Sequence, residues 1–368
     1  MDLNQIVYKP DLRFEDIVNI LNADSDESHA IIEQAATRTL NEYIGNKVYF
    51  RGLVEFSNIC TCDCLYCGIR KSNPNYDRYT LSKDEILSSA RWIASEGYGS
   101  MVLQSGERRD AQFVDFVCDL VETIKRETRS DDLPEGLGIT LSVGEQPEET
   151  YRKFFAAGAH RYLLRIETTN PELFARIHPK EIDFHRRLES LRTLIRVGFQ
   201  TGTGVMIGLP GQTTEDLARD VLFFRDMDID MIGMGPYISH KDTPMGEFFD
   251  ENQTRLKQIY RLALRMIGAV RLALKDVNIA ATTALQAIDP MGREAGLRFG
   301  ANVVMPQTSP IGHRKDYLLY EGKPCVEDTT EMCKFCLERR IDSVGRQIAR
   351  NEWGDPKHFA NRRKRNAQ

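Results

Sequence analysis

The sequence predicts an α/β fold, a (β/α)8 TIM barrel with a helical extension at its N-terminus and a cysteine-bearing extension at its C-terminus. From about residue 47, short runs rich in β-branched residues alternate with amphipathic helical patterns. This alternation is typical of a parallel sheet covered by helices. The chain has eight strand-like runs, and eight strands close a barrel. A doubly wound open sheet is the alternative fold.

The predicted elements follow one another in a regular order. Residues 1–46 form the helical extension, 47–310 the barrel, and 311–368 the extension with a second cysteine group and a basic tail. Amphipathic segments such as SKDEILSSARWIASEGY and TEDLARDVLFFRDM lie between consecutive strands and predict the outer helices. The predicted strands span 48–56, 100–105, 138–143, 161–167, 201–207, 230–236, 279–285 and 301–306.

Composition and charge limit the classes of partner. The chain has 368 residues, 41% of them hydrophobic, and a formal net charge of -5, which gives no reason to expect nucleic acid or an anionic membrane as a partner. The start lacks a basic region followed by an apolar run, and no stretch approaches the roughly 18 consecutive apolar residues of a membrane span. We therefore expect a cytoplasmic protein. We expect the basic tail, 355–368, to be solvated and disordered.

Seven of the eight cysteines fall into two tight groups. In a cytosolic chain, clustered thiols indicate metal ligands or catalytic groups rather than disulfides. Cys118 stands alone in an apolar stretch, and we interpret it as a small buried hydrophobic residue. The two groups are Cys60, Cys62, Cys64 and Cys67, then Cys325, Cys333 and Cys336.

The first group lies on a loop directly after the first predicted strand. Cys60, Cys64 and Cys67 have C-x3-C-x2-C spacing, and three thiolates on one short loop can hold three irons of a [4Fe–4S] cluster. The fourth iron is then free to bind a small molecule. Cys62 lies two residues from both Cys60 and Cys64, and we interpret it as a non-ligand. A zinc knuckle is the alternative, but it needs a fourth ligand at zinc-site spacing.

Polar residues also follow several other predicted strands. Barrels of this class carry their chemistry at the carboxyl ends of the strands, so these residues are expected on one face. They are Ser105 to Glu107 after the second strand, Ser142 to Glu145 after the third, Glu167 and Thr168 at the end of the fourth, and Gly208 to Gly211 after the fifth.

The C-x3-C-x2-C spacing, with the aromatic Tyr66 just before the last cysteine, resembles the signature of the radical S-adenosylmethionine (SAM) superfamily. The resemblance implies that the amino and carboxylate groups of SAM chelate the fourth iron. It also implies reductive cleavage of SAM to methionine and a 5′-deoxyadenosyl radical. The cofactors carry this chemistry, while the protein binds, orients and excludes water.

The same resemblance assigns SAM contacts residue by residue. Gly106 lets the backbone approach closely, and Glu107 supplies an anionic acceptor for the SAM ammonium. Glu167 resembles the residue that takes the ribose hydroxyls, and Arg187 the arginine that pairs with the SAM carboxylate. Taken singly, Glu107 could instead be a charge at a helix N-terminus, and Arg187 an exposed helix residue. The cofactor-binding residues expected are Tyr66, Gln104, Ser105, Gly106, Glu107, Ser142, Glu167 and Arg187.

Further segments resemble the biotin synthase-like branch of this superfamily, and more closely the HydE family of [FeFe]-hydrogenase maturases. They include VLQSGE, TLSVGE, GLPGQT, DTP, ATTA and GANV, and the resemblance extends over nearly the whole chain from about residue 45. It implies that the substrate is a small iron–cysteine complex made by another maturase. The adenosyl radical would attack its sulfur during assembly of the hydrogenase binuclear iron subcluster. A flavodoxin or ferredoxin is implied as electron donor.

Substrate residues facing the barrel mouth are carried over from the same resemblance. Arg161 and Arg165 lie four apart on a predicted strand and therefore point the same way. A buried cation inside a barrel needs an anionic partner, which fits a substrate with carboxylate or cyanide groups. Met231 and Met305 could equally be core residues. The substrate residues expected are Thr140, Arg161, Met231, Thr282, Thr283, Met305 and Tyr317.

The second cysteine group has C-x7-C-x2-C spacing. Some members of the HydE family carry this spacing and bind an auxiliary Fe–S cluster there, so the resemblance implies Cys325, Cys333 and Cys336 as ligands of a [2Fe–2S] or [4Fe–4S] cluster. Zinc is the alternative, because three thiolates also suit this ion.

The chain departs from the family pattern at two positions. Cys62 stands where a charged or polar residue is expected, and Ile166 where a histidine is expected. Two other functions stay open. A methylornithine synthase would not need the second cysteine group, and a non-catalytic Fe–S or zinc scaffold would not need the SAM contacts.

Overall fold

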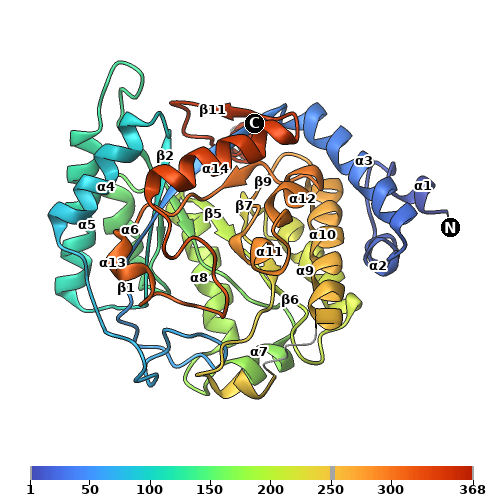
Figure 1. The fold of residues 1–368 in the computed structure, drawn as a ribbon, viewed down its shortest axis with the longest axis horizontal. Helices are drawn as coiled ribbons and strands as arrows, with labels where there is room; N and C mark the ends of the chain where they lie inside the picture. The colour runs from blue at the N-terminus through green and yellow to red at the C-terminus, as the bar shows by residue number, and fades with distance from the viewer. Residues whose placement is uncertain (1, 249–252, 367–368) are drawn as a thin grey trace.

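The computed structural model describes residues 2–248 and 253–366 and shows parallel strands curled into a barrel with helices outside (Figure 1). The strand order is β10-β1-β2-β3-β4-β5-β7-β9, and one parallel bridge, Ala280 to Val303, joins its two ends. This confirms the predicted α/β barrel. The strands are β1 (Lys47–Ser57), β2 (Ser100–Ser105), β3 (Gly138–Ser142), β4 (Arg161–Leu163), β5 (Gln200–Thr203), β7 (Met231–Ile232), β9 (Asn278–Ile279) and β10 (Val303–Val304).

Five of the predicted strand runs are longer than the observed strands by several residues. The runs 161–167 and 301–306 are shortened to β4 and β10. The runs 201–207 and 230–236 are each interrupted, because Gly204 and Gly233 approach so closely that a side chain on Gly204 would collide with the Gly233 carbonyl. Beyond them, β6 (Met206–Ile207) and β8 (Gly235–Pro236) form a separate parallel pair. The prediction of a strand over 279–285 is wrong beyond Ile279, because α11 (Thr283–Ile288) begins after Thr282.

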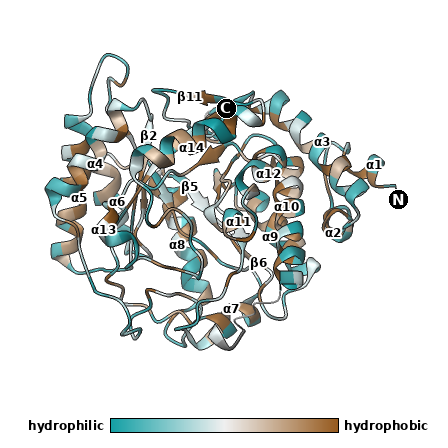
Figure 2. Ribbon diagram, in the orientation of Figure 1, coloured by the Kyte–Doolittle hydropathy of each residue, from teal (hydrophilic) through white to brown (hydrophobic). Residues whose placement is uncertain are grey.

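The outer helices bury their apolar faces against the barrel. In Figure 2 their outward sides are largely teal and the sides toward the sheet largely brown, as expected for amphipathic helices. The helices around the barrel are α4 (Lys83–Ser95), α5 (Ala111–Glu127), α6 (Glu148–Ala156), α7 (Pro171–Ile177), α8 (Phe184–Val197), α9 (Thr214–Asp226), the 3-10 helix η1 (Pro244–Phe248), α10 (Gln253–Leu274) and α12 (Gly292–Arg298). None of the described helices is long and apolar enough to cross a bilayer.

The N-terminal helices are attached to one side of the barrel. They are α1 (Leu3–Ile6), α2 (Phe14–Asn22) and α3 (Asp26–Tyr43), and α2 and α3 pack against α9 and α10 (Figure 1). Buried Ile17, Ile20 and Ile32 form the apolar part of this contact. Arg265 of α10 adds a polar anchor by donating a hydrogen bond to the Leu21 carbonyl at 2.8 Å.

The C-terminal chain closes the amino end of the barrel. After α13 (Ile311–Arg314) and α14 (Thr330–Ser343), β11 (Gln347–Ala349) pairs with the first residues of β1. The following residues run beneath the strands. There the Arg161 guanidinium donates to the Asp355 carboxylate at 2.5 Å and to the Trp353 carbonyl at 2.7 Å. The open face of the barrel is therefore its carboxyl end.

The expectation of a disordered tail is wrong for the described residues up to 366. They form α15 (Lys357–Asn366), which lies over an acidic surface. His358 contacts Asp228 at 2.7 Å and Asp276 at 2.9 Å, and Arg362 contacts the buried Asp230 at 2.7 Å. These carboxylates are distant in sequence from the basic tail, so composition alone did not reveal them.

The contacts of His358 predict a pH-dependent stability. Burial lowers the pKa of His358, but its two carboxylate partners outweigh this and raise the pKa from 6.5 to about 9. Because the pKa is higher in the folded protein, protonated His358 stabilises the fold, fully so below pH 6.5. This stabilisation is lost as the pH rises through about 9. The shift corresponds to about 3 kcal/mol. Urea unfolding of the full chain at about pH 6 and about pH 9.5 measures this loss.

The matched control uses a second histidine. His358→Gln should remove this component of the pH dependence, whereas His185→Gln, at an exposed position on α8, should retain it. Equal pH dependence in both variants would contradict the assignment of this effect to His358.

Candidate active site at the carboxyl end of the barrel

The first cysteine loop is fixed by backbone contacts to three neighbouring segments. It leaves the end of β1, and the Thr61 N–H donates to the Glu107 carbonyl at 2.9 Å. The Leu65 N–H donates to the Ile177 carbonyl at 3.0 Å, and the Gly68 N–H to the Leu319 carbonyl at 3.1 Å. These backbone hydrogen bonds within the chain therefore give the loop a defined position above the barrel.

Gly106, at the end of β2, lies directly against the cysteine loop. A Cβ at this position would collide with the Ile59 carbonyl and with the side chain of Cys60. Only glycine lets the end of β2 approach the cysteine loop so closely. The adjacent Glu107 N–H then donates to the Cys60 sulfur at 3.3 Å.

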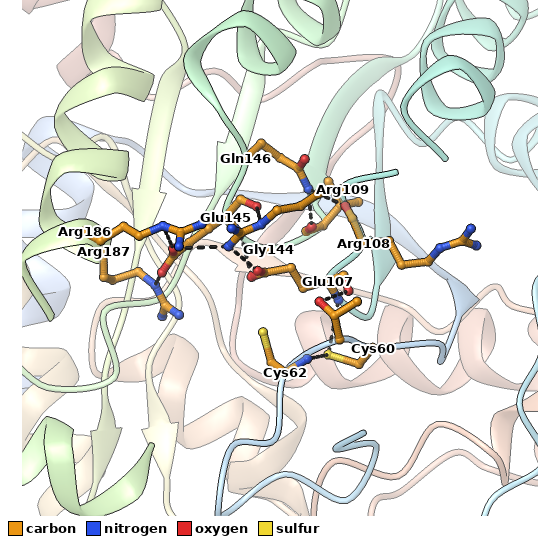
Figure 3. Close-up of polar contacts among 12 residues, drawn as sticks. Cys60, Cys62, Glu107, Arg108, Arg109, Gly144, Glu145, Gln146, Arg186 and Arg187 are labelled. Carbon is orange, nitrogen blue, oxygen red and sulfur yellow. Dashed lines mark hydrogen bonds and ion pairs between the residues drawn. The ribbon is translucent and has the colours of Figure 1, made fainter. Parts of the chain in front are cut away.

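The four thiols of the loop have different environments. A hydrogen bond with Cys62 lowers the pKa of Cys60 to about 7, whereas burial raises the pKa of Cys64 to about 12. Burial also raises the pKa of Cys67. Thiolates are the form that binds metal, and a cation in the loop would favour them. In Figure 3 the Cys62 side chain points toward the carboxylates above the loop.

Two glutamates and several arginines form a network above the cysteine loop (Figure 3). The Glu107 carboxylate accepts hydrogen bonds from the Glu145 N–H at 2.8 Å and from Arg109 at 2.5 Å. The Glu145 carboxylate pairs with Arg187 at 2.5 Å and with Arg186 at 3.2 Å. Burial lowers the pKa of Arg187, but Glu145 outweighs this effect and holds the pKa above its usual value. Both charge signs are thus present at close range.

A cavity of about 540 Å³ opens between the cysteine loop and this network. It has the size range of small-molecule sites, and its lining carries both carboxylates and guanidinium groups. Such a lining complements a ligand that has both an ammonium and a carboxylate group. The lining includes Cys62, Glu107, Arg109, Glu145, Arg186 and Arg187.

Glu167 lies on another side of the loop, where it acts on Cys64 electrostatically. Its backbone is left-handed, with φ 66°, which is unusual for glutamate and typical of strained functional positions. One oxygen of its buried carboxylate lacks a hydrogen-bond donor among the described residues, although it lies 2.9 Å from a nitrogen of Arg165. This oxygen therefore keeps hydrogen-bonding capacity that the described residues do not use.

The other residues predicted to bind SAM surround the same loop but do not line the large cavity. Tyr66 packs edge-on against His178 with the ring centres 5.6 Å apart. Ser105 donates to the carbonyl of Gly106 at 2.8 Å, and Ser142 ends β3. Gln104 points to the barrel interior, where it donates to the Tyr317 hydroxyl at 3.4 Å.

The predicted substrate residues lie deeper in the barrel. Thr140, Met231 and Met305 line an internal cavity of about 30 Å³, which is room for about one water molecule. Thr282 donates to the Met234 carbonyl at 3.2 Å, and Thr283 follows it as the first residue of α11. A larger ligand therefore has to bind above this level, toward the cysteine loop.

Arg161 is fully buried at the amino end of β4. The anionic partner that its burial requires is Asp355 of the same chain. Arg51 lies beside it, also buried, and donates to the sulfur of Met231 at 3.0 Å. A role of Arg161 in substrate binding stays a prediction.

Several site residues were missed by the sequence analysis as individual contacts. Glu145 and Arg109 connect Glu107 to Arg187. The sequence analysis named Glu145 only as the end of a polar segment and did not name Arg109. In the barrel interior, Lys323 pairs with Glu55 at 2.6 Å. An isolated lysine or arginine gives no signal in sequence, because its partner lies far along the chain.

In the second cysteine group, Cys325 lies on the loop before α14, and Cys333 and Cys336 lie in the first turns of that helix. The thiols of Cys325 and Cys333 and the Asp328 carboxylate lie within 4.8 Å of one another. Cys336 is one helical turn further on, and its sulfur accepts a hydrogen bond from Arg340 at 3.1 Å. The structure thus brings two of the three predicted ligands together, with an aspartate that was not predicted.

Comparison with known proteins identifies the family. A model described as the Radical SAM superfamily matches residues 54–224. The [FeFe] hydrogenase maturase subunit HydE of Thermotoga maritima is 43% identical over 317 residues, which are 86% of this chain and 86% of that protein. The chain belongs to the HydE family of radical SAM enzymes. Membership brings a [4Fe–4S] cluster and SAM as cofactors. The cysteine loop and the cavity lined by both carboxylates and guanidinium groups fit both.

Two further similar proteins share less sequence with this chain. The 3-methylornithine synthase of Methanosarcina acetivorans is 27% identical over 79% of this chain and 78% of that protein. The crystal structure of a methylornithine synthase has a TM-score of 0.79 at 23% identity and covers 95% of this chain and 98% of that one. The latter similarity supports the fold of this HydE-family chain.

The close contact at Gly106 predicts a variant that impairs cluster assembly. The methyl group of Gly106→Ala would force the cysteine loop away from β2, at a cost of about 1 to 3 kcal/mol. We expect less iron per chain after anaerobic reconstitution and less 5′-deoxyadenosine from SAM. Gly312→Ala, where nothing lies within 4 Å of the new Cβ, is the control. If both variants load iron as the wild type does, the contact has no role in assembly.

Proposed function

We propose that this HydE-family enzyme acts in [FeFe]-hydrogenase maturation, where it uses SAM to transform a small iron–cysteine complex into a precursor of the binuclear iron subcluster. The observation that carries this proposal is the 43% identity to a HydE over most of both chains, combined with a cavity of both charge signs beside the loop with the C-x3-C-x2-C spacing. When bound, the reduced cluster and SAM supply a 5′-deoxyadenosyl radical.

The residues around the cavity have complementary roles toward SAM. Glu107 offers an anionic acceptor to the ammonium group, and it is held in place by the Glu145 N–H at 2.8 Å. Arg187 offers a planar guanidinium to the carboxylate, and its position is fixed by Glu145 and by the Arg165 carbonyl at 2.6 Å. The Glu167 oxygen that lacks a hydrogen-bond donor among the described residues would accept a hydrogen bond from the ribose hydroxyls.

The substrate would enter from the carboxyl end of the barrel. The amino end is closed by Trp353 and Asp355, and the interior cavity of about 30 Å³ lies below the cysteine loop. The Thr140 hydroxyl, which lines this small cavity, lacks a hydrogen-bond partner among the described residues. We infer a flavodoxin or ferredoxin as electron donor and another maturase as the source of the substrate.

Reductive SAM cleavage tests the proposed function. The reconstituted full chain, reduced with dithionite, is given SAM alone, SAM with an iron–cysteine complex, or SAM with lysine. We expect 5′-deoxyadenosine and methionine in equal amounts, with a rate that the iron–cysteine complex raises. Stimulation by lysine alone would favour a methylornithine synthase, and no product from a loaded cluster would favour a scaffold.

The geometry also predicts an effect on SAM affinity. Glu107→Gln removes the anionic acceptor, and hydrogen bonds to charged groups contribute about 1.5 to 3 kcal/mol. Since about 1.4 kcal/mol is a factor of ten, we expect the Kd of SAM to rise about tenfold or more. Equilibrium binding measurements check this. Arg192→Gln, at an exposed position on α8, should bind SAM as the wild type does. Unchanged affinity in Glu107→Gln would remove this residue from the SAM site.

A further inference from the structure

The second cysteine group contains a potential ligand that its C-x7-C-x2-C spacing does not include. Among residues 2–248 and 253–366, only the set of Cys325, Asp328 and Cys333 brings three metal-ligating atoms within 4.8 Å of one another. We propose that the Asp328 carboxylate is the fourth ligand of a metal centre that Cys325, Cys333 and Cys336 also hold. This proposal does not depend on the radical chemistry of the first cysteine loop.

The loop that carries Cys325 and Asp328 is organised by a buried arginine. Arg314 is 1% exposed, and its guanidinium donates to the carbonyls of Cys325 at 3.1 Å and Asp328 at 2.7 Å. The same side chain donates to the Ser309 carbonyl at 2.8 Å, which anchors it to the barrel. Both ends of the loop are thus tied to one rigid group, so the aspartate is held beside the thiols.

The remaining two thiols come from the first turns of α14. Thr329 caps this helix by accepting a hydrogen bond from the Met332 N–H at 3.1 Å. Cys333 and Cys336 are three residues apart and therefore lie on the same face of the helix. The N-terminal end of a helix favours negative charge, which suits thiolate and carboxylate ligands.

Charge and distance both favour a bound cation at this site. The two thiolates of Cys325 and Cys333 and the Asp328 carboxylate would repel one another at such close range, and a bound cation offsets this repulsion. Ligand atoms around a single tetrahedral ion lie about 3.5 Å apart, and the spacing of Cys325, Asp328 and Cys333 is compatible with ligands that share one ion. Iron in an Fe–S cluster and zinc both accept this mixture of sulfur and oxygen ligands.

A fourth protein ligand has a functional consequence. Metal sites with a full set of protein ligands are structural or transfer electrons, whereas catalytic sites keep one position open. The first loop leaves an iron open by having three ligand cysteines, and Asp328 would close the second site. The second centre would then not bind substrate directly.

The test compares variants at two adjacent acidic residues. The full chain is reconstituted anaerobically with iron and sulfide, or separately with zinc, and metal per chain is measured together with Mössbauer or absorption spectra. Asp328→Asn should lose the second centre to a chelator at least tenfold faster than the wild type, as expected for a weakened metal site. Glu327→Gln, at an exposed neighbour, should match the wild type.

Asp328→Cys provides a second measurement that does not depend on loss of metal. It should retain the centre, with a spectrum shifted toward full sulfur ligation. Unfolding of the metal-free chains checks that Asp328→Asn folds as the wild type does. Retention of either iron or zinc, weakened only in Asp328→Asn, supports the proposal. Equal retention and identical spectra in all chains, or no metal in the wild type beyond the first cluster, would overturn it.

Discussion

The contact of Glu107 with the cysteine loop is the interaction on which the rest of the site depends. The Glu107 N–H donates to the Cys60 sulfur, and its carbonyl accepts from Thr61. Its carboxylate meanwhile accepts from the Glu145 N–H and from Arg109. One residue therefore connects the metal loop, the end of β3 and the charged cavity. Because these contacts share a residue, the cysteine loop and the charged cavity cannot move independently.

The order and approximate positions of the strands, and the cysteine spacing, could be predicted because their signals are local. Buried parallel strands give continuous apolar runs, and the cysteine spacing lies within eight residues, Cys60 to Cys67. The long-range partners could not be predicted in this way. Lys323 and Glu55 are 268 residues apart, and Arg161 and Asp355 are 194 apart. No periodicity or spacing in the sequence relates such pairs.

The C-terminal extension contacts both ends of the barrel. Near the carboxyl end, Lys323, which lies two residues before Cys325, enters the interior and pairs with Glu55. At the amino end, Asp355 neutralises the buried Arg161. Unpaired buried charges are costly, so both ion pairs hold the extension to the barrel. The second cysteine group is thereby placed on the same rigid framework as the first.

The central claim is that three thiolates hold the first cluster and leave one iron free for SAM. Electron paramagnetic resonance of the reduced full chain, recorded with and without SAM, tests it most directly in the wild type and in Cys62→Ser. The account predicts a [4Fe–4S] signal in both proteins and a change of its g-values on addition of SAM in both. Loss of the cluster in Cys62→Ser, or a signal that SAM leaves unchanged, would contradict it.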